Sequence, residues 1–102
     1  MTLREMQRRV YQNKLNHRFN VTDVPLEFCL LSGEVAETFD AWNKKKDSLG
    51  EEMADVAIYL LGLAEICGVD LQGEIERKME INEKRCYVRV DGVLQKKLPT
   101  ED

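Results

Sequence analysis

Four stretches of the chain repeat apolar residues at the spacing of a helix, and little in the sequence interrupts them. Of the 102 residues only 6 are glycine and 2 are proline, which favours long helices over many short strands. The expected helices cover about residues 2–18, about 23–42, 48–68 and about 70–86. We therefore predict an all-α fold with a helical core over about residues 2–86.

The ends of these helices carry residues that usually start and stop a helix. Ser48 and Glu51 fit a capping box, in which each side chain bonds a backbone N–H at the start of the third helix. Pro25 suits the first turn of the second helix, and Gly68 is typical of the position just after a helix. We expect Asp70 to cap the fourth helix, directly after the third has ended.

The last part of the chain changes from helical spacing to alternation. Residues 88–95 alternate around Asp91-Gly92, a dipeptide typical of a two-residue type I′ turn between paired strands. We therefore expect a small C-terminal β-hairpin over about residues 87–98. The short chain is predicted to form a single domain over residues 1–102.

Composition and charge exclude several classes of protein. The 15 basic and 19 acidic residues give a net charge of −4, whereas a general nucleic-acid binder usually carries a basic excess. No apolar run approaches the ~20 residues that span a bilayer, and residues 1–7 lack the apolar stretch of a secretory signal. Cys29, Cys67 and Cys86 are odd in number and lack CxxC spacing, which argues against a disulfide scaffold and a zinc ribbon. We expect a cytoplasmic protein without a nucleic-acid or membrane partner.

Two acidic pairs interrupt the apolar faces of the second and third expected helices. Glu34 and Glu37 are three residues apart, and so are Glu52 and Asp55, so each pair shares one helix face. The two faces run through Leu30, Glu34, Glu37 and Ala41, and through Glu52, Asp55 or Val56, Tyr59 and Leu63. Because the short connection 43–47 makes these helices antiparallel neighbours, the two pairs could face each other.

Four ionised carboxylates in one place repel, by about 3 kcal/mol for each pair at ~5 Å and an effective dielectric of about 20. Either protonation or cations would offset this repulsion, and ligands that are all carboxylate oxygens favour Mg²⁺ or Mn²⁺ over zinc. A di-iron bundle normally adds two Glu-x-x-His motifs, and the single histidine, His17, lies outside any such motif. The alternative is that both pairs are ordinary exposed acids, as we expect for Glu80 and Glu83 among their charged neighbours.

The fourth expected helix carries polar residues that suit a polyphosphate. Lys78, Asn82 and Arg85 are spaced by four and three, which places them on one helix face. Their side chains can bond phosphate oxygens beside a cation-loaded acidic cluster. The alternative is that Lys78 and Arg85 pair with nearby Glu74 or Glu83.

Taken together, these segments resemble the MazG-like all-α nucleotide pyrophosphohydrolases. The resemblance covers roughly residues 16–87 and follows the family pattern ExxE, ExxD and KxxxNxxR at residues 33–37, 51–56 and 78–85. Many members have an additional Glu where this chain has Gly33, a departure seen in the branch resembling dCTP pyrophosphatases. The resemblance implies a four-helix MazG-like domain whose helices pack across a homodimer or homotetramer.

The resemblance also implies a reaction. A (deoxy)nucleoside triphosphate would be hydrolysed to the monophosphate and pyrophosphate, in a role such as nucleotide-pool housecleaning. The implied Mg²⁺ ligands, with Mn²⁺ as the other option, are Glu34, Glu37, Glu52 and Asp55. The implied phosphate contacts are Lys78, Asn82 and Arg85. Glu37 and Glu52 are the expected catalytic carboxylates, Glu37 as the base that orients the attacking water, with Asp40 as a further acid behind the metal ligands.

Recognition of the base is assigned by the same resemblance. His17, Phe19 and Asn20 lie in the linker where related enzymes place nucleobase contacts, although packing roles are open to all three. Trp42 could stack on a base or cap the core, and residues 44–46 could be a solvated loop or reach the triphosphate. Other functions stay open: a non-catalytic helical interaction module, or a related diphosphatase acting on dUTP or on a phosphoribosyl-nucleotide.

Overall fold

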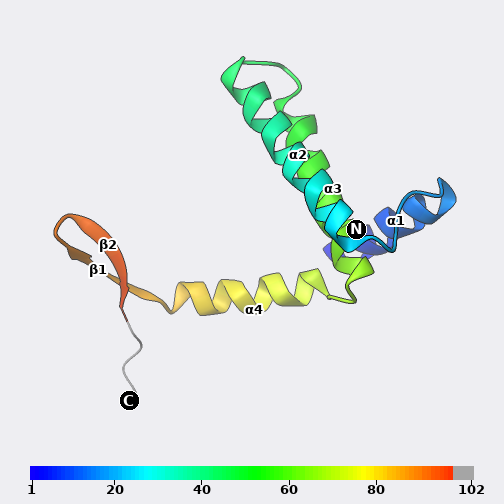
Figure 1. Cartoon of the computed structure of the whole chain (residues 1–102). Helices are drawn as coiled ribbons and strands as arrows, with labels where there is room; N and C mark the ends of the chain where they lie inside the picture. Colours follow the sequence, from blue (N-terminus) through cyan, green and yellow to red (C-terminus); the bar gives the residue numbers. More distant parts are fainter. Residues whose placement is uncertain (98–102) are drawn as a thin grey trace. The chain divides into compact units, whose positions relative to one another are not determined.

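The computed structural model describes residues 1–97, which form four helices and one two-stranded sheet (Figure 1). The elements are α1 (Leu3–Asn16), α2 (Val24–Asn43), α3 (Leu49–Ile66), α4 (Leu71–Glu83), β1 (Cys86–Val90) and β2 (Val93–Lys97). Within this part of the chain, no helix has the length and apolar character needed to cross a membrane. Two compact units, Met1–Gln72 and one beginning at Gly73, are described separately. The predicted all-α fold with a C-terminal hairpin is confirmed.

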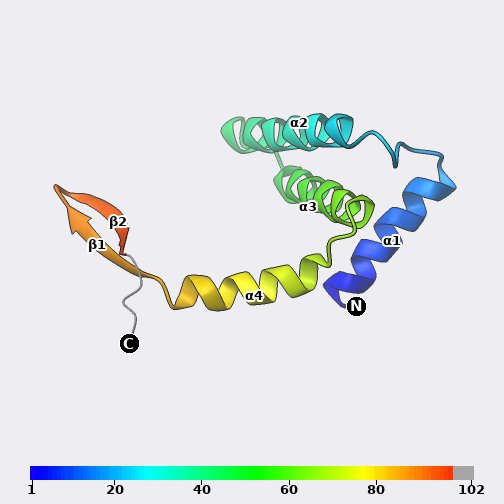
Figure 2. The same cartoon turned by 60° about the horizontal axis from the view of Figure 1, so that its bottom comes forward.

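The first unit is built around α2 and α3, which run antiparallel side by side (Figures 1 and 2). Residues 44–48 connect them, so the short connection expected from the sequence is confirmed. α1 packs against α3. The faces of α2 and α3 that carry the acidic residues are therefore brought together by the helical hairpin itself.

Several helix ends follow the sequence signals. The Asp23 carboxylate accepts a hydrogen bond from the Leu26 N–H at 3.1 Å and caps α2, which has its proline in the first turn. Gly68 follows α3 with a φ of 70°, and its N–H bonds the Glu65 carbonyl at 3.1 Å. A left-handed residue just after a helix is typically glycine, so the predicted end of α3 is confirmed.

The predicted capping box at the start of α3 is wrong. Ser48 occupies the N-cap position, but its side chain makes no capping hydrogen bond, and its ψ of 3° differs from the extended conformation that an N-cap serine needs. The first backbone bond of the helix runs from the Glu52 N–H to the Ser48 carbonyl at 3.0 Å. The tight turn that returns the chain alongside α2 sets the Ser48 backbone, and Glu51 is an exposed side chain with no capping partner on Ser48.

The core of the first unit is thin. Its buried apolar residues are Ala41, Leu61, Leu63 and Ala64. Large apolar side chains on α2 and α3 remain exposed, among them Phe28, Phe39 and Trp42. Two polar side chains, Gln7 and Glu27, are buried instead. Large exposed apolar side chains that lie together often mark an interaction surface.

Gln7 fixes α1 to the end of α3. Its side-chain amide nitrogen donates to the Glu65 carboxylate at 2.8 Å and to the Val69 carbonyl at 2.7 Å. Its amide oxygen accepts from the Leu71 N–H at 3.2 Å. One buried side chain therefore satisfies polar groups of α3, the following turn and the start of α4.

The second unit contains the hairpin that the sequence predicted. β1 and β2 pair antiparallel with Val90 opposite Val93, which leaves a two-residue turn. Asp91 and Gly92 have φ values of 53° and 80°, the positive values of a type I′ turn. Residue 98, the last residue of the predicted hairpin segment, lies outside the described residues.

The fourth helix is shorter than predicted. α4 starts directly after Asp70 but ends at Glu83 rather than near residue 86. The Arg85 N–H closes a turn on the Asn82 carbonyl at 3.2 Å, and Cys86 already belongs to β1. Cys86 begins the segment that pairs with β2, so the helix ends before it.

Candidate metal centre

The acidic pairs of α2 and α3 converge. Glu34, Glu37 and Glu52 each offer one carboxylate oxygen, and the three oxygens lie within 4.8 Å of one another. Asp55, one turn after Glu52, is not part of this three-oxygen group. Its charge still reaches the group, because it contributes to the raised pKa of Glu34. Glu34 and Glu52 are half-buried, whereas Glu37 and Asp55 are exposed.

Two oxygens in this cluster are buried without a partner. Oε2 of Glu34 and Oε2 of Glu52 are closed to water and make no hydrogen bond. Burial raises the pKa of the Glu34 carboxyl, and the charges of Glu37, Asp55 and Glu52 raise it further. Within residues 1–97 none of these four acids forms an ion pair with a lysine or arginine.

The donor set fits a divalent cation. Buried carboxylate oxygens without a partner are costly, and a cation at the centre of the group would satisfy them. All the available ligands are hard oxygens, which suit Mg²⁺ or Mn²⁺. Glu34 and Glu37 come from one helix and Glu52 from its neighbour, so the pairing of α2 with α3 creates the group.

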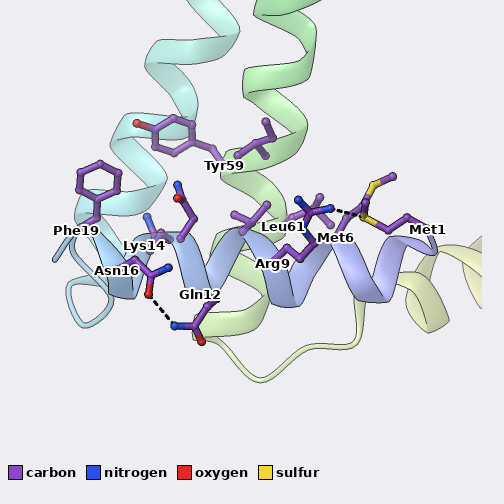
Figure 3. A pocket seen from close by; sticks show the side chains of 12 residues that line it. Met1, Met6, Arg9, Gln12, Lys14, Asn16, Phe19, Tyr59 and Leu61 are labelled. Atoms are coloured by element: carbon purple, nitrogen blue, oxygen red, sulfur yellow. Dashed lines mark hydrogen bonds between the residues drawn. The ribbon is translucent and has the colours of Figure 1, made fainter.

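A cavity of about 710 Å³ lies between α1 and α3 in the same unit (Figure 3). Apolar side chains such as Val10, Ile58 and Leu61 line part of it. Lys14, Phe19 and Tyr59 lie together at one end, and Met1 lies at the other (Figure 3). Gln12, Asn13 and Asn16 add side-chain amides, and Gln12 donates to Asn16 at 2.9 Å.

A buried ion pair stands at the aromatic end of this cavity. The Lys14 ammonium contacts the Glu27 carboxylate, and the two side chains are 12% and 3% exposed. The same ammonium lies 5.8 Å from the centre of the Tyr59 ring. The pair joins α1 to α2 across the edge of α3, and each charge is compensated by the other.

Tyr59 connects the ion pair to the acidic cluster. Burial raises the pKa of the Tyr59 hydroxyl, and the negative charges of Glu34 and Glu27 raise it further. Asp55 and Glu37 add smaller effects in the same direction. Tyr59 follows Asp55 by four residues and Glu52 by seven on α3, so it shares a helix face with these acids and also lines the cavity.

The ion pair was not expected from the sequence, although a signal for it exists. Glu27 precedes Glu34 by seven residues, which places both on the same face of α2. The acidic face of α2 therefore extends two turns toward the start of the helix, as far as Glu27. Lys14 carries no comparable signal, because a lysine on a largely polar helix is ordinarily exposed.

The residues expected to contact a base do not form one group. Phe19 lines the cavity, and His17 stacks on it with ring centres 5.3 Å apart. The Asn20 side chain is used within the linker, where it accepts from the Asp23 N–H at 2.9 Å and donates to the Asp23 carbonyl at 2.9 Å. Trp42 is 62% exposed and lies beside Phe39, ring centres 6.1 Å apart, at another hollow.

The loop between α2 and α3 is held by ion pairs. Lys44 and Lys46 bond the Asp40 carboxylate at 2.9 and 3.1 Å. The hydrogen bonds from Lys44 and Lys46 lower the pKa of Asp40. Asp40 therefore has two lysine partners, and its place behind the metal ligands stays a prediction.

The predicted phosphate contacts lie in the second unit. Lys78 and Asn82 are exposed on α4, and Arg85 follows the end of the helix. The expectation that all three share one helix face is wrong for Arg85, because the helix ends before it. Glu74, offered above as a partner for Lys78 or Arg85, bonds Arg77 at 2.6 Å instead. That Lys78, Asn82 and Arg85 contact phosphates stays a prediction.

The fold and the carboxylate group define a helical protein with a candidate site for a divalent cation. The model of the MazG-like family matches residues 26–98, and the chain belongs to that family.

Individual relatives match part of their length. dCTP pyrophosphatase 1 of Rattus norvegicus is 41% identical over 69 residues, which cover 57% of this chain and 41% of the rat protein. The human protein of the same name is 39% identical over 64 residues, with 52% and 38% covered. A dATP/dGTP diphosphohydrolase of Salmonella phage PMBT28 is 47% identical over 45 residues, 43% of this chain and 16% of that protein. The chain therefore spans less than half the length of these relatives. No solved structure matches it.

Proposed function

We propose that this protein hydrolyses (deoxy)nucleoside triphosphates to the monophosphate and pyrophosphate, with Mg²⁺ held by the four acids of α2 and α3. The observation that carries the proposal is the convergence of three carboxylate oxygens from Glu34, Glu37 and Glu52 within 4.8 Å. Relatives named dCTP pyrophosphatase 1 and dATP/dGTP diphosphohydrolase support the reaction. Their names include pyrimidine and purine nucleotides, so they leave the base open.

The four carboxylates have different roles in the proposed reaction. Mg²⁺, when bound, polarises a phosphoryl oxygen and lowers the pKa of water. Glu34 and Glu52 suit the ligand role, because each has a buried oxygen without a partner. Glu37 is more exposed and has one oxygen in the group, which leaves the other to accept a proton from the attacking water. Asp55 completes the ligand set from the neighbouring turn.

The phosphates need donors outside the acidic cluster. Lys78 and Asn82 present an ammonium and an amide on α4, and Arg85 adds a guanidinium that can bond a phosphate through two N–H groups. We assign these three side chains to the phosphates of the substrate. The positive charges of Lys78 and Arg85 also offset part of the repulsion between the acidic site and a polyanion.

Assembly into a homodimer or homotetramer is part of the proposal. The apolar residues of α2 and α3 that stay exposed include Phe28, Phe39 and Trp42, whereas the buried apolar core is small. A second copy packed on these faces would bury them and thicken the core. The substrate implies a cytoplasmic protein that acts on the nucleotide pool.

A non-catalytic interaction module is the second candidate, because the structure offers a surface for it. Val35, Phe39, Trp42 and Met53 line an apolar hollow of about 470 Å³ between α2 and α3. A partner helix could fill it without any use of the carboxylates. This candidate predicts no turnover of nucleotides.

The test is product analysis with purified protein and Mg²⁺. A panel of dNTPs that includes dUTP is incubated with the protein, and pyrophosphate and orthophosphate are measured separately. We expect pyrophosphate and the nucleoside monophosphate, and no pyrophosphate when EDTA removes the metal. Release of orthophosphate with a nucleoside diphosphate, or no release from any substrate, would contradict the proposal.

A further inference from the structure

The Lys14–Glu27 pair leaves hydrogen-bond donors available. A lysine ammonium carries three N–H bonds, and within the described residues Glu27 is the one carboxylate that pairs with it. Lys14 also lines the cavity between α1 and α3. Glu27 is 3% exposed and so holds the ammonium from the protein side, which leaves the cavity side for a ligand.

The fold makes room for this lysine. Gly62 of α3 faces α1, and a Cβ at Gly62 would lie 3.2 Å from Cδ of Lys14. The aliphatic part of Lys14 therefore lies against the backbone of α3, and the charged end reaches Glu27. Gly62 and Glu27 restrict the Lys14 side chain from two sides, so little side-chain entropy is left to lose when a ligand binds.

The part of the cavity beside Lys14 suits a flat, weakly polar group, and Arg9 is the second cationic side chain in the cavity lining. Phe19 and Tyr59 offer ring faces beside Lys14, and Val10, Ile58 and Leu61 offer apolar contacts. A triphosphate would be drawn to cations held by the acidic cluster, whose Glu52 and Asp55 precede Tyr59 by seven and four residues on the same face of α3. A nucleoside triphosphate with its phosphates at the cluster can therefore place its base in the cavity.

The Lys14 ammonium donates hydrogen bonds but cannot accept them, so it distinguishes nucleobases by the acceptors that they carry. Lys14 offers only N–H groups, so its partner on the base must be an acceptor. Cytosine, thymine, uracil and guanine carry a carbonyl oxygen. Adenine accepts only at its ring nitrogens, and at C6 it carries an amino group, which donates and offers an ammonium no acceptor. Resting on the proposed function, we propose that Lys14, positioned by Glu27, donates to a base carbonyl in this cavity, so that the protein favours carbonyl-bearing bases over adenine.

The sharpest test compares two substrates that differ at one position of the purine. dITP carries a carbonyl at C6 where dATP carries an amino group. We expect kcat/KM of the wild-type protein to be roughly 10- to 100-fold higher for dITP, the range for a hydrogen bond to a charged donor. Equal values for the two substrates would overturn the inference.

A variant then assigns the preference to Lys14. Lys14→Met/Glu27→Leu removes the donor without leaving a buried charge, a replacement that proteins often tolerate. We expect its dITP to dATP ratio to fall to within about threefold of 1, through KM rather than kcat. Arg8→Met removes an exposed cation of α1 outside the cavity and should keep the wild-type ratio.

The outcomes separate this inference from the proposed function. A wild-type protein that releases no pyrophosphate from any substrate contradicts the function. An active protein whose double variant loses dITP and dATP turnover by the same factor places Lys14 on the sugar or phosphates, which overturns the inference alone. If the double variant does not fold, the wild-type comparison of dITP with dATP still decides.

Discussion

Glu34 on α2 and Glu52 on α3 each keep one carboxylate oxygen buried and without a hydrogen-bond partner, on facing sides of a helical hairpin. A protein seldom leaves two such oxygens unsatisfied in one place unless a ligand completes them. Repulsion between two ionised carboxylates here would destabilise the metal-free fold, and a cation held by both would convert that repulsion into binding free energy. The proposed site therefore predicts that stability and metal binding are coupled, and measurements of stability can test it.

The register of the ExxD motif can be tested with two adjacent glutamates. Glu52→Gln removes a ligand oxygen and should lower pyrophosphate release at least ~100-fold. Glu51→Gln should retain nearly wild-type activity, because Glu51 is exposed and lies outside the cluster. Steady-state rates with one dNTP and excess Mg²⁺ give the comparison. Similar losses in both variants would mean that Glu51 and Glu52 have been assigned the wrong way.

The raised pKa of Glu34 predicts how stability depends on pH without metal. Its ordinary value is 4.5, and the folded protein binds the proton more tightly than the unfolded chain does. Between the two pKa values the folded state holds more protons, so the free energy of unfolding falls as pH rises from 4.5 through the raised pKa. Glu34→Gln should flatten this dependence. Melting temperatures in EDTA from pH 4 upward, compared with Glu51→Gln as control, would show it; parallel curves for all three proteins would mean that the Glu34 pKa is not raised.

Gln7 should contribute more to stability than any other amide of α1. Its side chain is 4% exposed and makes hydrogen bonds to Glu65, Val69 and Leu71. Gln7→Ala removes the partner of three part-buried polar groups and should lower the free energy of unfolding by about 1–3 kcal/mol. Gln12→Ala is the matched control, because that exposed side chain bonds only Asn16 among the described residues, so less than about 0.5 kcal/mol is expected. Urea titrations of both variants decide, and equal midpoints would refute the assignment.

The sequence predicted the elements well where local signals decide the structure. Pro25 in the first turn of α2, Gly68 after α3 and Asp91-Gly92 in the hairpin are confirmed, because a short segment contains the whole physical cause. Ser48 failed as a capping residue, since its conformation depends on how the chain turns back alongside α2.

The candidate site also contains residues whose arrangement the sequence predicts and residues whose arrangement it does not. The helical spacing of Glu34, Glu37 and Glu52 was enough to predict that they meet, because the connection between α2 and α3 is short. The Lys14–Glu27 pair joins residues of two helices across a longer linker, and no spacing rule reaches across it. Helical spacing alone predicts that Arg85 shares a helix face with Lys78 and Asn82. The helix in fact ends at Glu83, before the strand pairing that begins at Cys86, and spacing within a helix does not indicate where such pairing begins.

The last prediction concerns Asp55, which lies near the three-oxygen group but outside it. Its negative charge raises the pKa of Glu34, so replacing it with asparagine removes a source of repulsion. In EDTA, Asp55→Asn should therefore be more stable than the wild type, by about 0.5–1 kcal/mol because solvent screens this exposed side chain. In excess Mg²⁺ the order should reverse, since the wild type gains binding free energy that the amide supplies less well.

Asp47→Asn is the control, an exposed acid in the loop between α2 and α3 that should shift stability little and equally in both conditions. Paired melting curves with chelator and with Mg²⁺ measure the two shifts for each variant. If Asp55→Asn behaves like Asp47→Asn, Asp55 is not a ligand, and the proposed cation site is limited to the three glutamates. If it stabilises the protein in EDTA and loses that advantage in Mg²⁺, the repulsion and the metal binding have the same origin, which is the relation that a carboxylate ligand requires.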